Sequence, residues 1–357
     1  MKQISAEIVA DSINEQGDRI TTFVLEYPRI IHAEVMTHRM FSRNAASSRA
    51  IPFERMVKSV QEEPFIPIAF QKSHSGMQGT EYFTSEYDIN IAKEHWLRAR
   101  DNAVMEATAL ASLPVTKQLC NRLLEPFQWY KVIVTATEYE NFFKLRCPQY
   151  LCDITSEDGK YRSRKDALKD WALEDTPDLV WLKMNTGGAE IHISMLAEKM
   201  WDAYNENEPT QLKAGEWHIP FGDKFSIADI EDKITHKDPR FVEITHNSFE
   251  RKEHLLTTEA KIKIATARCA RISYNNFEGK DDYEADIKLH NRLAKNGHAS
   301  PFEHCARSMS REEYIVYLKG KGKYVIKIDD VLPNRLAEGW SRNFRGFIPY
   351  RELIERP

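Results

Sequence analysis

The sequence lacks the motifs that mark metal sites and redox dithiols. It contains no CxxC pair and no HExxH spacing, so neither zinc chemistry nor a thioredoxin-like function is indicated, and we expect no metal site. An odd number of cysteines favours reduced and mostly buried thiols over a disulfide framework. The five cysteines are Cys120, Cys147, Cys152, Cys269 and Cys305.

The sequence also lacks a long apolar run. No segment has the length and hydrophobicity needed to cross a bilayer, and the acidic residues near the N-terminus are unlike a signal peptide. We therefore expect a cytoplasmic protein that does not associate with a membrane.

Positive charge is not in excess. The chain has 50 Lys and Arg against 54 Asp and Glu, which gives a formal net charge of −4. No global positive field is present to hold a nucleic-acid polymer, so an anionic ligand must meet a local basic cluster. With 357 residues, 42% hydrophobic and 29% charged, the composition is that of an ordinary globular protein with a sizeable core.

Hydrophobic patterning predicts both strands and helices. Alternation over residues 8–25, around turn-forming residues 14–18, predicts a β-hairpin, and the β-branched residues 131–137 predict a further strand. Helical spacing is the criterion for the remaining segments. It occurs over residues 30–40, 91–113, 117–124, 189–204, 260–270 and 282–295. We predict an α+β fold with a central, mainly antiparallel sheet flanked by helices.

A charged stretch interrupts this pattern. Residues 149–188 lie between two strongly patterned segments and are predicted to be an insertion whose middle forms a surface helix. A charged connection near Asp229 is the best candidate for a division. It would separate a catalytic body, residues 1–229, from residues 230–357, which would complete the same fold.

The densest polar signal is THRMFSRNAASSR, residues 37–49. Arginine holds phosphate through a planar fork, and serine hydroxyls with free backbone N–H groups complete an anion cradle. A solvated helix face is the ordinary explanation for a basic run. Here the apolar flanks, Ile30-Ile31 and Ile51-Pro52-Phe53, favour side chains that line a cleft. The preceding helical spacing predicts that the run lies at a helix end and in the loop after it.

This run resembles the signature of the flavin-dependent thymidylate synthases, which is Arg-His-Arg, seven residues, then Ser. The chain has Thr37-His38-Arg39 and Ser47, with threonine in place of the first arginine, as in the long phage-type form THRxFSRNxxSSRAIP. The flavin contact of that first arginine is therefore unassigned.

Further segments resemble the same long members: QKSHSGMQG, KQLCNRLLEPF, ATEYENFFKLR and GEWHIPF. HASPFEH, residues 298–304, is similar to an element that precedes the arginine motif in short members but follows it here. The resemblance thus implies the fold of this family with a rearranged order of motifs.

The resemblance implies two sets of site residues. Those that would bind dUMP are Ser47, Ser48, Arg49, Arg122 and Arg146, and the three arginines would also act in catalysis. Those that would bind FAD are His38, Arg39, Asn44, Asn141 and His304.

Alternative roles exist for several of these residues. Arg122 and Arg146 could be surface ion-pair partners. His304 could be a core histidine, since Ser300, Pro301 and Glu303 form the pattern of a helix start with an N-cap and a capping box. His218 is predicted to be structural.

The reaction implied by the resemblance is conversion of dUMP to dTMP. Methylenetetrahydrofolate would donate the carbon, and NADPH-reduced FAD would supply the hydride. The Pro-Cys-His tripeptide of the unrelated, cysteine-dependent thymidylate synthases is missing, and Cys147 is predicted to be a packed thiol. The resemblance further implies a homotetramer with active sites between subunits, in the cytoplasm of the cell or, if the chain is phage-encoded, of its host.

One segment departs from the family pattern. Many relatives carry Ala-Gln-x-Glu-Ile, whereas this chain has Ala189-Glu190-Ile191-His192-Ile193. This difference keeps open a sister enzyme of the same fold that releases 5-hydroxymethyl-dUMP. A homologue that binds nucleotide or flavin without turnover is the other alternative.

Overall fold

The computed structural model describes residues 2–75, 79, 81–151, 160–242, 249–274, 282–314 and 339–355. Cys152 and part of the QKSHSGMQG loop lie outside the described residues. Among the residues described, no helix has the length and apolar character required to span a bilayer.

An antiparallel hairpin forms the centre of the main sheet. Strands β1 (Ser5–Asn14) and β2 (Arg19–Pro28) pair along their length, as the alternating pattern predicts. The turn is stabilised by Asn14, whose Oδ1 accepts hydrogen bonds from the backbone N–H groups of Gln16 and Asp18 at 3.0 and 2.8 Å. Gly17 has φ +86, a conformation that glycine adopts without a steric cost.

Three more strands extend this sheet. They are β4 (Trp129–Ala136), β3 (Ser42–Ala45) and β7 (Thr210–Leu212), and the strand order is β3-β4-β2-β1-β7. Of the pairings described in this sheet, only the short one between β1 and β7 is parallel. The prediction of a mainly antiparallel central sheet is confirmed.

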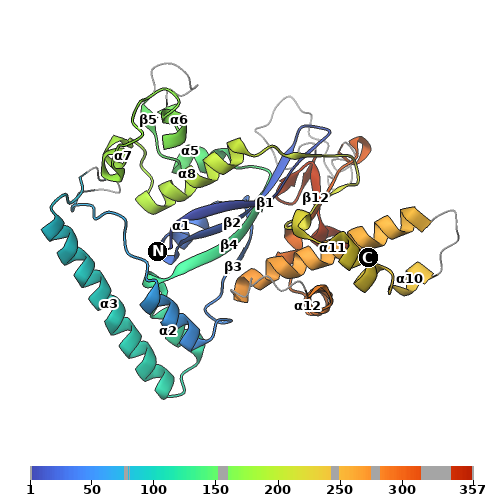
Figure 1. Cartoon of the computed structure of the whole chain (residues 1–357), viewed down its shortest axis with the longest axis horizontal. Coiled ribbons are helices and arrows are strands. Elements are labelled where there is room, and N and C mark those ends of the chain that lie inside the picture. Colours follow the sequence, from blue (N-terminus) through green and yellow to red (C-terminus); the bar gives the residue numbers. More distant parts are fainter. Residues whose placement is uncertain are drawn as a thin grey trace, which may run out of the picture.

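Helices cover both faces of the sheet (Figure 1). On β4, Val132 and Val134 join the apolar cluster beneath α8 (Ile191–Glu206), whereas Ile133 joins the cluster beneath α11 (Phe249–Arg271). Successive strand residues point to opposite faces, so β4 is buried on both sides. The sheet flanked by helices confirms the α+β prediction.

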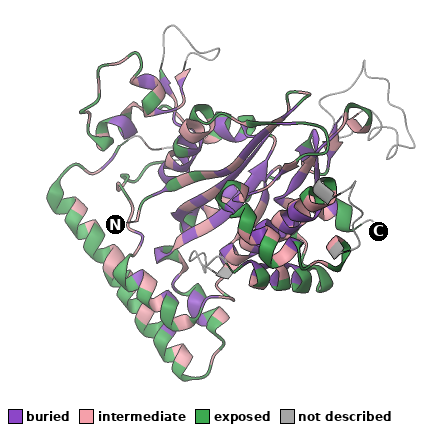
Figure 2. Ribbon diagram, turned by 45° about the vertical axis from the view of Figure 1, so that its right-hand side comes forward, coloured by how far each residue is buried: buried purple, intermediate pink, exposed green. Residues whose placement is uncertain are grey.

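Helices α2 (Phe53–Glu62), α3 (Glu86–Ser112) and α4 (Lys117–Arg122) project from one end of the sheet. Ser85 caps α3, which begins before the predicted start at residue 91. Pro114 follows its end, close to the predicted limit at residue 113. Only Ala107 of α3 is buried, so most of this helix is exposed (Figure 2).

The remaining elements are shorter or lie around this frame. The N-terminal half contains η1 (Arg29–Ile31), α1 (His32–Val35), η2 (Glu125–Phe127), α5 (Glu140–Arg146), β5 (Tyr150–Leu151), β6 (Lys160–Tyr161), α6 (Arg164–Ala167) and α7 (Asp178–Met184). The C-terminal half contains β8 (Trp217–His218), η3 (Gly222–Lys224), α9 (Ile227–Ile230), η4 (Glu231–Thr235), α10 (Pro239–Val242), η6 (Ile272–Tyr274), α12 (Tyr283–Lys295), η7 (Ser300–Glu303), β9 (Ala306–Ser308), β10 (Trp340–Ser341), β11 (Phe344–Arg345), β12 (Phe347–Pro349) and α14 (Tyr350–Ile354).

Residues before and after Asp229 belong to the same sheet and to the same apolar cluster. Strands β12, β9 and β8 form a three-stranded antiparallel sheet, and α11 packs against the central sheet. The predicted insertion has a small apolar cluster of its own around Tyr150, Tyr161 and Trp181.

Candidate functional site

The polar run of residues 37–49 passes along the edge of the central sheet. The prediction of a helix end followed by a loop is wrong for its middle, because Ser42–Ala45 form β3 and pair with β4 from Ser42↔Thr135 to Ala45↔Val132. The helix before the run is also shorter than predicted, since α1 ends at Val35. The sheet edge gives these residues hydrogen-bond partners that the local pattern does not reveal.

At the start of the run, His38 contacts Arg146. The Arg146 Nε donates to Nε2 of His38 at 3.2 Å, and its Nη1 lies 3.4 Å from Glu34 Oε2. Burial, together with nearby Arg146 and Arg43, lowers the pKa of His38 to about 4, so the ring is neutral at pH 7. Two residues 108 positions apart that were predicted for different ligands are thus in direct contact.

Arg43 is used within the protein. Its Nη1 donates to the carbonyl oxygens of Met36 at 3.0 Å, His38 at 3.2 Å and Val35 at 3.5 Å. The guanidinium therefore satisfies carbonyls at the end of α1. Of the three arginines in the run, Arg43 is the one whose guanidinium is hydrogen-bonded to backbone carbonyls.

Asn44 joins the run to the C-terminal part of the chain. Its amide nitrogen donates to the Cys269 carbonyl at 2.8 Å, and Ser300 Oγ donates to its Oδ1 at 3.1 Å. The HASPFEH element therefore lies against β3. The predicted capping box is wrong, because Ser300 bonds to Asn44 and Glu303 pairs with Arg351.

At the end of the run, Asn121 anchors the serine segment. Its Nδ2 donates to the carbonyl oxygens of Ser48 at 2.8 Å and Ile51 at 3.0 Å. The Ser47 hydroxyl accepts the Arg49 backbone N–H at 3.3 Å. Asn121 was not predicted as a site residue, although it lies within the matched KQLCNR segment.

Two predicted phosphate ligands are exposed in this region. The guanidinium of Arg49 forms no ion pair with any side chain in the described ranges, and that of Arg122 has only a contact of 3.8 Å with Glu125. Both are therefore available to an anion.

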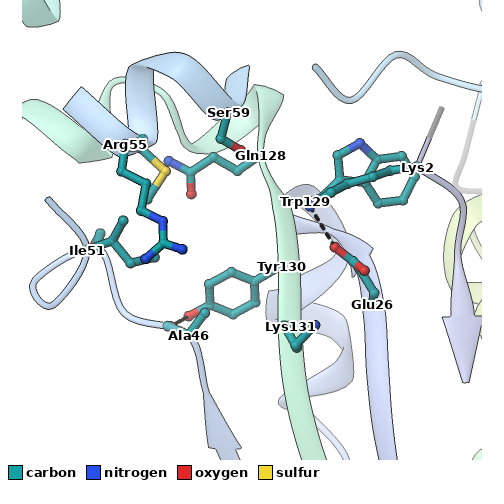
Figure 3. A pocket seen from close by; sticks show the side chains of 12 residues that line it. Lys2, Glu26, Ala46, Ile51, Arg55, Ser59, Gln128, Trp129, Tyr130 and Lys131 are labelled. Carbon is teal, nitrogen blue, oxygen red and sulfur yellow. Dashed lines mark hydrogen bonds and ion pairs between the residues drawn. The ribbon is translucent and has the colours of Figure 1, made fainter. Parts of the chain in front are cut away.

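A cavity of about 70 Å³ lies beside Ser48, between α2 and β4. Figure 3 shows the Arg55 side chain directed into the space between Ile51, Gln128 and Tyr130. The lining includes three basic residues, Lys2, Arg55 and Lys131, against one acidic residue, Glu26, which pairs with Lys2 at 2.9 Å. Neither Arg55 nor Lys131 was predicted, because neither lies in the run of residues 37–49 or in a segment predicted to contribute to the site.

A second cavity, of about 160 Å³, lies between β3 and the hairpin formed by β10 and β11. Its lining residues are Ser42, Glu303, Arg342, Asn343, Phe344 and Pro349. Asn343, in the lining of this cavity, donates from its Nδ2 to the backbone carbonyl of Arg39 at 3.3 Å. The backbone of the predicted flavin ligand Arg39 is therefore held beside the cavity. Arg39 is exposed, and its guanidinium has no ionic partner in the part of the chain that the structure describes.

His304 is fully buried. Its Nδ1 lies 2.8 Å from Thr135 Oγ1, and its Nε2 has no hydrogen-bond partner among the described residues. Burial and the neighbouring His218 lower its pKa to about 3. A ligand could contact this nitrogen only by a path into the interior. Asn141, on the exposed side of α5, has no described hydrogen bond to the run.

The departing segment at residues 189–193 forms the start of α8. Glu190 accepts hydrogen bonds from the backbone N–H groups of His192 and Ile193 at 2.8 and 3.1 Å. Its other oxygen lies 2.5 Å from His192 Nδ1, and His192 Nε2 accepts the N–H of Ile68. Both unusual side chains thus have structural partners.

The four described cysteines are unpaired and buried. Burial raises the pKa of Cys147 well above its usual value and that of Cys305 to about 12. Neither the Cys147 thiol nor the Cys305 thiol is ionised at pH 7. In the ranges covered by the structure, no group of three or more His, Cys, Asp or Glu side chains could hold a metal ion.

No model of a known protein family matches the chain, and no curated protein matches it. Similar solved structures include two of the UMP/dUMP methylase PolB from Streptomyces cacaoi. The complex with 5-Br dUMP is 15% identical over 53% of this chain and 66% of that chain, with a TM-score of 0.37. The complex with 5-Br UMP is 16% identical over 58% of this chain and 90% of that chain, with a TM-score of 0.40. The match thus spans slightly less than two thirds of the first neighbour, and neither TM-score is high enough to assign a function.

The polar run therefore lies beside several of the predicted site residues, although not beside all of them. His38 and Arg146 meet at its start, the HASPFEH element contacts its middle, and Asn121 and Arg122 lie at its end. Among the described residues, these contacts are spread along the run from its start to its end.

Proposed function

We propose that the chain is a flavin-dependent thymidylate synthase that converts dUMP to dTMP, with methylenetetrahydrofolate as carbon donor and NADPH as reductant. The observation that supports the proposal is the run of residues 37–49, which combines a phosphate-type sequence with two exposed arginines, Arg39 and Arg49, that lack ionic partners in the described chain.

In this proposal Ser47, Ser48 and Arg49 bind the dUMP phosphate. Arg122, next to the Asn121 anchor, would bind the same nucleotide, and Arg146 would approach the pyrimidine and stabilise negative charge as C5 becomes nucleophilic. Arg146 lies at the opposite end of the run from Arg49. The proposed homotetramer accounts for this separation, because a neighbouring subunit could complete each site.

FAD would be held by Arg39, His38, Asn44, Asn141 and His304. The residues fit in part: Arg39 is exposed, His38 is a neutral ring beside Phe41, and His304 carries an unpaired buried nitrogen. The amide of Asn44 is already hydrogen-bonded within the protein. Bound flavin would supply the hydride that completes the methyl group.

The four cysteines that the structure describes support a route without a protein thiolate. A cysteine nucleophile requires an ionised and accessible sulfur, whereas Cys147 is buried with a raised pKa. The chain's own contribution would then be to bind, orient and polarise dUMP.

Replacing Arg49 by alanine tests the proposal. We expect dUMP affinity, measured by calorimetry, to fall at least about tenfold, because a charged hydrogen bond to phosphate contributes roughly 1.5–3 kcal/mol. The melting temperature should not change, since Arg49 is exposed. Arg98→Ala, at an exposed arginine of α3, is the matched control and should bind dUMP normally. Undiminished binding by Arg49→Ala would refute the assignment of the phosphate site.

The altered segment at Glu190 and His192 is the reason to test a second product, 5-hydroxymethyl-dUMP. Mass spectrometry of the reaction product distinguishes a methyl from a hydroxymethyl group. NADPH oxidation that depends on added dUMP would exclude a binding protein without turnover.

A further inference from the structure

A chain of hydrogen bonds connects His304 to His218 through the interior of the protein. His304 Nδ1 lies 2.8 Å from Thr135 Oγ1, which lies 2.7 Å from Thr22 Oγ1. Thr22 Oγ1 lies 2.8 Å from His218 Nε2, and His218 Nδ1 lies 3.0 Å from Ser12 Oγ. All five side chains are buried, and Thr22 and Thr135 are direct cross-strand neighbours on β2 and β4.

Both histidine rings in this chain of hydrogen bonds are neutral. Complete burial lowers the pKa of each histidine to about 3, so each ring carries one proton, on either Nδ1 or Nε2, near pH 7. The tautomer of a neutral histidine is determined by the groups to which its two nitrogens are hydrogen-bonded.

The number of protons available to these hydrogen bonds couples the tautomer of His218 to that of His304. Each threonine hydroxyl has one proton and takes part in two of the hydrogen bonds. If Thr22 donates to Thr135, then Thr135 donates to His304 Nδ1, and Thr22 must accept from His218 Nε2. Both rings are then protonated at Nε2. If the direction is reversed, both rings are protonated at Nδ1.

Unlike tautomers leave a buried group unpaired. With His218 protonated at Nε2 and His304 at Nδ1, one threonine hydroxyl proton has no acceptor in the chain. With the opposite assignment, the two threonine oxygens face each other at 2.7 Å without a proton between them. Buried polar groups without partners are unfavourable, so the matched arrangements are preferred.

We infer that His218, through Thr22 and Thr135, is a positioning residue that determines which ring nitrogen of His304 carries the proton. The relay ends at Nε2 of His304, which has no hydrogen-bond partner among the described residues. In one direction Nε2 is a hydrogen-bond donor, and in the other it is an acceptor. A planar heterocycle with a carbonyl or ring-nitrogen acceptor would select the donor form, and the tautomer of His218 would change with it.

The change of direction balances without a net charge. A proton from water enters at the Ser12 hydroxyl, and each group passes one proton to the next along Ser12, His218, Thr22, Thr135 and His304. The Nε2 proton of His304 passes to water and replaces the proton that Ser12 received, so this sequence converts the Nε2-protonated arrangement into the Nδ1-protonated one. The donor form of His304 Nε2 is reached by the same steps in reverse. Each hydroxyl and each ring is neutral before and after.

Nitrogen-15 NMR of the full chain labelled at histidine tests the inference, because protonated and unprotonated ring nitrogens have distinct shifts. We expect His218 and His304 to be protonated at the same ring nitrogen in the free protein. Opposite tautomers, or a charged ring at pH 7, would overturn the inference.

Variants at Thr22 provide the second readout. Thr22→Val removes the hydroxyl with little change of shape and should alter the tautomer ratio of His304, two side chains away. Thr22→Ser retains the hydroxyl and should restore the wild-type ratio. An unchanged His304 signal in Thr22→Val would also overturn the inference, and if that variant does not fold, the wild-type tautomers decide alone.

The coupling between the tautomers of His218 and His304 is expected in the protein without ligand. Only the selection of a tautomer by a heterocyclic ligand rests on the proposed function. Titration with FAD separates the two: if FAD does not bind while the tautomers match, the proposed function fails and the relay stands. If FAD binds but the tautomers are opposite, the relay fails alone.

Discussion

At the scale of single residues, three arginines of one short run have different roles. Arg43 donates to the backbone of α1, whereas Arg39 and Arg49 are exposed, and neither guanidinium has an ionic partner within the described ranges. The residue type is the same in each case. What differs is whether backbone carbonyls lie within reach of the guanidinium.

Replacing Arg43 by alanine should therefore reduce stability. Removal of the guanidinium leaves carbonyls of Met36 and His38 with one partner fewer, and we expect the free energy of unfolding to fall by about 2 kcal/mol. Denaturant unfolding measures the change. Arg39→Ala is the control and should alter stability by less than about 0.5 kcal/mol. Equal effects of the two substitutions would contradict the structural role of Arg43.

At the scale of an element, the start of α8 explains an unusual sequence. The first backbone N–H groups of a helix have no partners within it, and Glu190 accepts two of them at the N-cap. A negative side chain at this position also interacts favourably with the helix dipole. Stabilising α8 supports the sheet, since this helix covers one face.

Removing this cap with Glu190→Ala should lower the free energy of unfolding by about 1 kcal/mol. Glu190→Asp keeps a carboxylate at the cap and should retain most of the stability. Chemical denaturation of both variants measures the difference. A loss of turnover in Glu190→Ala without any loss of stability would instead indicate a chemical role.

At the scale of the whole molecule, several histidines are wholly or partly buried, and burial favours their neutral form. Burial lowers the pKa of His32 and His38 to about 4, and that of His218 and His304 to about 3. In the unfolded chain these rings take up protons near pH 6.5. Between pH 6.5 and 4 the unfolded state therefore binds more protons than the folded state, so stability rises with pH and is lost on acidification.

A pH series with His218→Gln isolates one of these contributions. The slope of unfolding free energy against pH between 6.5 and 4 should be smaller in the variant by up to about 1.4 kcal/mol per pH unit. Glu198 and Asp202, whose pKa values are raised by burial, act in the opposite sense, but they are common to both proteins and cancel in the difference. Met105→Gln, at an exposed position of α3, changes no titratable group and should leave the slope unchanged. Parallel curves for wild type and His218→Gln would contradict the assignment.

Sequence patterns predicted the elements whose cause is local. The hairpin of β1 and β2 follows from alternation around a turn that Asn14 and Gly17 can form. Helix α3 follows from its helical spacing and the Pro114 beyond it, although it begins at Glu86, before the predicted start at residue 91. The edge strand β3 was missed, because Ser42–Ala45 carry no strand pattern and pair only once β4 lies beside them.

The sequence by itself determined which segments are strands or helices over long stretches, and it concentrated phosphate-type side chains in residues 37–49. Only the tertiary structure decided their partners. Ser300 bonds to Asn44 rather than capping its own helix, and His304 belongs to a buried chain with Thr135, 169 positions away. Local propensity depends on neighbours along the chain, whereas a polar side chain that becomes buried must pair with whatever group folding brings within about 3 Å.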